Sequence, residues 1–225
     1  MDYSPLLISL KAASIATIIT FILGIYAAYL TTTRLKKLKG IVDGVLLLPL
    51  VLPPTVVGFL LLVLLGRNSV LGKFLSQYDI SIMFSQAATI IASIVVAFPL
   101  MYRTARGAFE QLDKNIIYVA KTLGLSNHKI FFKIILPNSS SSIMAGTVLA
   151  FARGLGEFGA TIMIAGNIPG KTQTMSVAVY SAVQAGNRSL AYKWVMILAI
   201  ISLSSMIMMS KLESMQKGKV GKGDK

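Results

Sequence analysis

Cysteine is absent from this 225-residue sequence, and histidine occurs once, at His128. The absence of cysteine excludes disulfide bonds and metal sites built on thiolates. Acidic residues are also scarce, at eight Asp and Glu together. A membrane enzyme or a metal centre needs clustered ionisable or metal-binding side chains. The composition therefore argues against a catalytic site, a metal site or a cofactor bound by this chain.

Charge of either sign is scarce as well. Charged residues make up 13% of the chain, whereas about 25% is usual for a soluble domain. Hydrophobic residues make up 55%, and the mean hydropathy is +0.73. These values predict an all-α membrane protein with one domain and no separate soluble module.

Apolar stretches divide the chain into about five candidate spans. Three of them are uncharged and longer than the roughly 20 residues that a spanning helix needs. The fourth is interrupted by Arg153 and Glu157. The stretches cover residues 12–33, 44–66, 80–102, 134–170 and 194–210.

The chain divides into a membrane domain at 6–211 and a Gly- and Lys-rich tail at 212–225, which we expect to be disordered. The first apolar stretch lacks a basic segment before it and ends in a cluster of cations at 34–39, so we interpret it as a span and not as a cleaved signal peptide. Residues 175–187 are helical in pattern but rich in polar side chains. We expect them to form a re-entrant or interfacial helix, followed by Trp194 as an interface anchor.

The excess of basic residues, a net charge of +14, has a topological explanation. With the N-terminus outside, the inner segments carry fifteen Lys and Arg and the outer loops carry five. This bias predicts a cytoplasmic-membrane protein with its C-terminus in the cytoplasm. The basic segments lack interleaved aromatic residues, so a nucleic-acid partner is not expected, whereas contact with anionic membrane lipid is.

The second stretch contains three prolines, Pro49, Pro53 and Pro54, followed by Thr55 and Gly58. Prolines break the helical hydrogen-bond ladder, which a membrane tolerates where neighbouring helices or a cavity satisfy the freed carbonyls. Two interpretations stay open. Pro53, Pro54 and Thr55 form a kink that lines or gates a pathway, or they form a structural kink packed against neighbouring helices.

The fourth stretch combines small residues with one ion pair. Arg153 and Glu157 lie four residues apart, so they can pair within a helix. The pair is either structural or acts in gating or anion passage, and Thr161 offers a hydroxyl to such a pathway. Small residues at a spacing of four, which permit close helix packing, occur on two faces: Gly146, Ala150 and Gly154, and Ala152, Gly156 and Ala160.

A basic, amphipathic elbow separates the third and fourth stretches. Asp113 or Asn115 can begin a short helix that ends at Gly124, and Ser126 can begin a second one that ends before Pro137. At helical spacing, one face of the first helix carries Ile116, Ile117, Ala120 and Leu123, and one side of the second carries Ile130, Phe131, Ile134 and Ile135. The pattern alone fits either interfacial helices on lipid or a surface that meets another protein.

The elbow resembles the cytoplasmic "EAA" loop of ABC importer permeases. Gly124, Ile134, Leu136 and Pro137 fall in the register of that motif, while Tyr118 and Val119 stand where Glu and Ala are usual. In the family, this loop is the coupling helix, which sits in a groove of the ATP-binding subunit. The resemblance implies that the residues of this chain that couple to that subunit are Tyr118, Val119, Ala120, Gly124, Ile134, Leu136 and Pro137.

Residues 151–161 and 166–174 are similar to segments of molybdate and sulfate importer permeases, and the Gly-Lys-Thr-Gln-Thr at 170–174 is closer to the molybdate branch. This resemblance implies a type I ABC importer transmembrane fold and a channel-forming subunit for molybdate or tungstate. The expected partners are a second permease copy, two ATP-binding subunits and an external oxyanion-binding protein. No Gly-x-x-x-x-Gly-Lys-Ser/Thr loop is present, so ATP and Mg²⁺ are expected on the partner subunit.

Two alternatives remain on sequence grounds. A sulfate or thiosulfate permease of the same family differs from a molybdate permease only in its substrate. A secondary anion transporter would be expected to show an internal repeat and buried acids for ion coupling. The sequence shows no repeat, and Glu157 is the only acid well inside a span.

Overall fold

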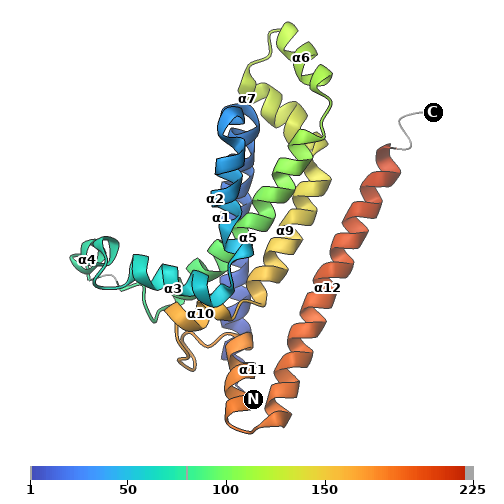
Figure 1. Cartoon of the computed structure of the whole chain (residues 1–225). Coiled ribbons are helices and arrows are strands. Elements are labelled where there is room, and N and C mark those ends of the chain that lie inside the picture. Colours follow the sequence, from blue (N-terminus) through green and yellow to red (C-terminus); the bar gives the residue numbers. More distant parts are fainter. Residues whose placement is uncertain (1, 80, 221–225) are drawn as a thin grey trace.

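The computed structural model describes residues 2–79 and 81–220, in which all regular elements are helices (Figure 1). Three described segments are long and apolar enough to cross a membrane alone: α1 (Ser4–Thr33), α5 (Gln86–Glu110) and Arg188–Lys211 of α12 (Arg188–Val220). Two further spans result if each of two bent helix pairs counts as one. The expectation of about five spans therefore agrees with the helix lengths.

The first bent pair replaces the single span expected at 44–66. Helices α2 (Lys39–Val51) and α3 (Pro54–Leu65) meet at an angle of 110°. Leu52 and Pro53 both precede a proline, which disfavours helical backbone, and both are extended, with ψ of 143° and 138°. Two extended residues redirect the chain, so α3 and the short α4 (Val70–Ser76) project sideways from the bundle (Figure 1).

The fourth stretch is also interrupted, before it reaches Gly170. Helix α9 (Ser140–Leu155) ends at Gly156, and a separate helix α10 (Gly159–Ile164) follows. The sixteen residues of α9 are too few to span a membrane alone. Together with the helical segment at 127–138, from which α9 is bent by 72°, they are long and apolar enough to span. The prediction of one apolar helix through Arg153 and Glu157 is therefore wrong, because α9 ends between these two residues.

Helices α1, α5 and α9 pack closely through small residues. A Cβ atom on Gly146 would lie 3.0 Å from Thr104 Cβ, and one on Gly154 would lie 3.6 Å from Ser93 Cβ of α5. Ala150 is buried between them, so the first small-residue face is confirmed. The second predicted face is wrong, because Gly156 ends α9 and Ala160 belongs to α10.

Helix α10 lies across α3 at very short range. A Cβ atom on Gly58 would lie 2.8 Å from the Cα of Ala160, and one on Gly159 would lie 2.8 Å from Pro54 Cβ. These distances are shorter than real Cβ contacts, so each glycine is required by the approach of the other backbone. The sideways direction of α3 is thus fixed by α10.

Helix α11 (Met175–Gln184) has ten residues, too few to span, as expected for 175–187. Its first amide, Met175 N–H, donates to Ser9 Oγ of α1 at 2.8 Å. Trp194 is 3% exposed and packs against Leu155 and Met175, so its expected role as an interface anchor is wrong. Helix α12 continues to Val220, into the tail expected to be disordered, and residues 221–225 lie outside the described part.

Candidate functional site

The first half of the elbow is the helix α6 (Lys114–Thr122), and both of its ends have the predicted caps. Asp113 Oδ1 accepts a hydrogen bond from the amide of Asn115 at 2.9 Å. At the other end, the amides of Gly124 and Leu125 donate to the carbonyls of Lys121 and Ala120. This pair of bonds is a Schellman motif, and Gly124 has φ +74°, a conformation that favours glycine.

The second half of the elbow, residues 126–138, packs against the helix bundle. Ser126 begins α7 (Asn127–Ile130), and the chain continues through a wide π-type turn, η2 (Phe131–Ile135), into α8 (Leu136–Asn138). The ring of Phe131 lies 4.7 Å from that of Tyr29 in α1 and 6.2 Å from that of Phe109 in α5. Ile130 and Ile135 are buried beside it, so the side that they were predicted to share faces the bundle.

The apolar residues of α6 do not all face the same way. Ala120 is buried and Ile117 half-buried against the bundle. Ile116, Val119 and Leu123 are 48%, 59% and 75% exposed. Their spacing of three and four residues puts them on one side of α6, and their exposure shows that this side faces away from the bundle. Figure 1 shows α6 at the far end of the elbow. We call Ile116, Val119 and Leu123 the outer face of the elbow.

The seven residues that the resemblance assigned to coupling therefore fall into two groups. Ala120, Ile134 and Leu136 pack against the core formed by α1, α5 and the elbow. The other four are exposed: Tyr118, Val119, Gly124 and Pro137. The first group can hold the elbow in place, and the second can be reached by another protein.

The candidate pathway residues come together from two distant segments. Pro53, Pro54 and Thr55 form the exposed corner between α2 and α3. Gly159, which follows Glu157 by two residues, lies against Pro54 and the backbone of Thr55. Thr161 is buried on α10, and its hydroxyl has no hydrogen-bond partner among the described residues. The α3–α10 crossing thus joins both sets of candidates.

Arg153 and Glu157 form the predicted pair, but across the end of α9. Arg153 Nη1 lies 2.6 Å from Glu157 Oε2, while Glu157 Oε1 accepts the amide hydrogen of Ala160 at 2.8 Å. The glutamate side chain is 1% exposed and the arginine side chain 31%. Glu157 therefore caps α10 and also neutralises Arg153, an arrangement that favours the structural interpretation of the pair.

A second polar cluster was not predicted. Asp43 of α2 accepts a hydrogen bond from Tyr102 Oη at 2.5 Å and pairs with Arg106, both of α5. One turn further along, Lys39 pairs with Glu110 at 2.7 Å. The spacing of Arg106 and Glu110 was visible in the sequence, but nothing there indicated a partner on α2. These pairs hold the start of α2 against α5, close to the elbow.

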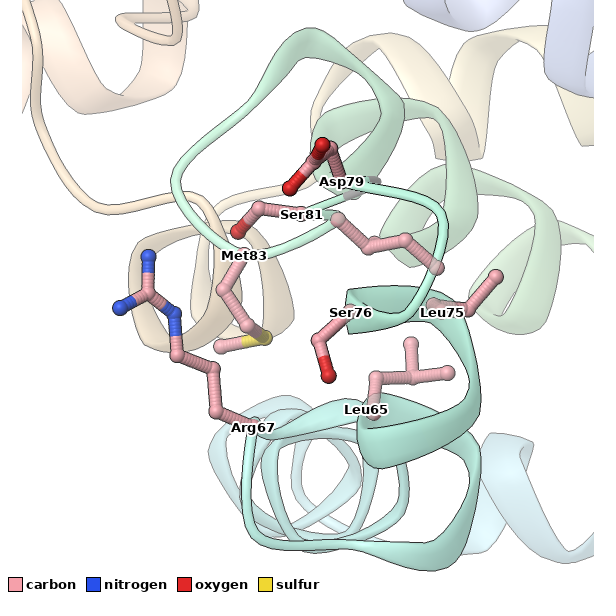
Figure 2. A pocket seen from close by; sticks show the side chains of 9 residues that line it. Leu65, Arg67, Leu75, Ser76, Asp79, Ser81 and Met83 are labelled. Carbon is pink, nitrogen blue, oxygen red and sulfur yellow. The ribbon is translucent and has the colours of Figure 1, made fainter.

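Away from the elbow, a cavity of about 280 Å³ lies between α4 and the segment at 79–83. Figure 2 shows its charged residues, Arg67 and Asp79, on different walls, and no ion pair joins them. A neighbouring cavity of about 710 Å³ includes Arg67, Ser81 and Lys171. Two cations and a hydroxyl make this region attractive to anions.

The comparisons with known proteins agree with this architecture. Residues 20–214 match the family described as binding-protein-dependent transport system inner membrane component. The chain belongs to this family. It is thus a permease component and not an enzyme.

Two relatives cover almost the whole permease. The chain is 40% identical to the molybdenum transport system permease protein ModB of Haemophilus influenzae over 100% of its length and 99% of the relative's. It is also 40% identical to ModB of Escherichia coli, over 98% and 97% of the two chains. Among solved structures, a chain of the MetNI methionine ABC transporter aligns with a TM-score of 0.73 at 16% identity, covering 93% of each chain. That likeness supports a type I ABC importer fold.

The ion pair gives a test of its own role. We expect Arg153→Met to lower the free energy of unfolding by about 3 kcal/mol, because it leaves a buried carboxylate without its cationic partner. Adding Glu157→Gln should restore most of that loss, since the amide oxygen still accepts from the Ala160 amide. Thermal unfolding of the purified permease measures both effects.

The double variant also separates the two interpretations of the pair. A stable double variant that still supports uptake shows that the pair is structural. A stable double variant without uptake shows that the pair acts in anion passage, and an unchanged stability of Arg153→Met would contradict the structural role.

Proposed function

We propose that this permease carries molybdate across the cytoplasmic membrane as part of an ATP-driven importer. The observation that supports the substrate is the 40% identity to two molybdenum transport permeases over nearly the whole chain. The similarity includes the segments at 151–161 and 166–174, and it favours molybdate over the sulfate alternative. Tungstate has the same tetrahedral shape and charge as molybdate, so we expect it to compete.

The charges of the structure suit the passage of a dianion. A free cation inside the pathway would hold the anion too tightly for release. Arg153 is the clear cation within the fourth apolar stretch, and Glu157 neutralises it. The exposed hydroxyl of Thr55 can make weak, transient contacts, whereas the Thr161 hydroxyl is buried and would contact an anion only if α10 moved. Such contacts leave tight selection to an external binding protein.

The transporter that we propose contains two copies of this chain, two ATP-binding subunits and an external oxyanion-binding protein. ATP and Mg²⁺ would be held by the ATP-binding subunits. The outer face of the elbow supports the docking of such a subunit, because it exposes three apolar side chains on a segment fixed to the bundle. The exposed apolar side chains of α3, among them Phe59 and Val63, support contact with a second copy.

Orientation is the first prediction. We expect the elbow and C-terminus in the cytoplasm and the N-terminus outside, because the basic residues are concentrated on the elbow side. The chain lacks cysteine, so Asn127→Cys provides a single thiol. An impermeant maleimide should label it in inverted vesicles but not in intact cells, and Ala185→Cys beyond α11 should show the reverse. Labelling of Asn127→Cys in intact cells would overturn this orientation.

Docking is the second prediction. We expect the double change Val119→Asp and Leu123→Asp to lower co-purification of the ATP-binding subunit about tenfold, because it charges the outer face that the subunit would bury. Gly124→Trp should act in the same direction: a Cβ there meets nothing within 4 Å, but the positive φ is strained for any other residue. Thr122→Asp, on another side of α6, is the matched control. Normal co-purification of both the double variant and Gly124→Trp would count against the elbow as the docking site.

Uptake is the third prediction. Cells that lack their own molybdate importer should accumulate radioactive molybdate when they express this chain with its ATP-binding subunit and binding protein. Unlabelled tungstate should compete and an equal concentration of sulfate should not. Uptake without the ATP-binding subunit would support a secondary transporter, and uptake of sulfate alone would overturn the substrate while leaving the permease assignment intact.

A further inference from the structure

A cavity of about 590 Å³ lies where the end of α1 meets the end of α5 and the elbow. Its walls include Thr31–Thr33 from the last turn of α1 and Asn127 from α7. One side of α6 closes it, with Lys114, Tyr118 and Lys121. This side differs from the outer face, and Tyr118 is the one exposed coupling residue named above that also lines the cavity.

The cavity carries an excess of positive charge. Four cations line it, Arg34, Lys39, Lys114 and Lys121, together with the acidic side chain of Glu110. Lys39 and Glu110 neutralise each other, since their charged atoms lie 2.7 Å apart. The other three cations have no ion pair with any described residue. Three like charges around one cavity repel each other, and an anion placed among them would relieve that repulsion.

Apolar side chains form another part of the lining. Tyr29, Phe109 and Ile130 line the cavity, and the ring of Tyr29 is part of the cluster that holds the elbow. A site for a small inorganic anion is lined by polar groups, whereas the lining here is divided between cations and hydroxyl groups on the one hand and apolar side chains of α1, α5 and α7 on the other. That division matches an amphipathic anion with a charged head and an apolar body.

We propose that this cavity binds the phosphate headgroup of an anionic phospholipid from the cytoplasmic leaflet. The inference rests on the cytoplasmic orientation of the elbow. Anionic lipids are concentrated in that leaflet, and basic cavities between spanning helices on the cytoplasmic side bind their headgroups. Arg34 follows α1, whereas Lys114 and Lys121 belong to α6, so one bound phosphate bridges the bundle and the elbow. Lipid binding would thus steady the elbow from the side opposite the ATP-binding subunit.

The test compares two triple variants of the full-length chain, purified with its ATP-binding subunit. The site variant is Arg34→Gln, Lys114→Gln and Lys121→Gln. The control variant is Arg103→Gln, Lys129→Gln and Lys133→Gln, which removes the same charge from exposed cytoplasmic residues outside the cavity. Bound lipid is counted by native mass spectrometry after addition of phosphatidylglycerol or phosphatidylcholine, and inorganic phosphate is tested as a competitor.

We expect wild type and the control variant to retain phosphatidylglycerol in preference to phosphatidylcholine, and the site variant to retain about tenfold less. Equal retention by both variants, or no preference for the anionic lipid, would overturn the proposal. Efficient competition by inorganic phosphate would assign the site to free phosphate. Binding that is seen only without the ATP-binding subunit would assign the cavity to that protein instead.

A smaller variant and the separate uptake assay distinguish loss of lipid binding from misfolding and from loss of transport. If the site variant does not fold, the pair Lys114→Gln and Lys121→Gln removes only the charges on α6, and it should lower retention in the same direction. Failure of molybdate uptake leaves the lipid result untouched, because lipid retention is measured on the purified protein. Labelling of Asn127→Cys from outside would overturn the lipid proposal together with the orientation.

Discussion

The carboxylate of Glu157 fixes the geometry of the centre of the molecule. It lies beyond the end of α9, forms an ion pair with Arg153 and accepts a hydrogen bond from the amide of Ala160. A buried carboxylate without such partners would be strongly unfavourable in an apolar protein interior. Its two bonds therefore hold the last turn of α9 next to the first turn of α10. Since α10 in turn meets α3 through Gly58 and Gly159, the sideways course of α3 depends on the same carboxylate.

The elbow follows a different principle, in which one half is fixed and the other half is left exposed. Phe131 packs against Tyr29 and Phe109, so movement of the elbow is transmitted to α1 and α5. The outer face of α6 is not covered by any described part of the chain and retains its apolar surface. A helix with a rigid attachment and an unpaired apolar side suits the transfer of force between a membrane domain and a docking subunit.

Local features could be predicted from the sequence because they depend on residues close together. Asp113, Gly124 and Ser126 have the roles that capping rules give them, and the long apolar runs became helices. What failed depends on distant partners. The prolines at 53 and 54 indicated that the helix is interrupted there. The angle of 110° between α2 and α3 depends also on packing against α10, about a hundred residues away in the sequence. Trp194 resembles an interface anchor in sequence, and only the fold shows that it is buried against Leu155.

The candidate site was predicted to a similar extent. The resemblance located the coupling segment, but it did not separate residues that hold the elbow, such as Ala120, from those that another protein can reach, such as Val119. That division depends on the rotation of α6 against the bundle, which the packing of Ile117 and Ala120 determines. The pair of Asp43 with Arg106 could not be found, because neither residue forms a motif by itself.

The distribution of charge connects these parts. Between the two ends of the molecule, the cations Arg106 and Arg153 each have a carboxylate partner. Cations without a carboxylate partner among the described residues include Arg67 near the lateral cavities and Lys121 on the elbow. For the proposed passage of molybdate, the pairing of Arg153 with Glu157 matters because a free buried cation would trap a dianion. A neutralised arginine would instead let the anion leave again, which is consistent with leaving tight selection to an external binding protein.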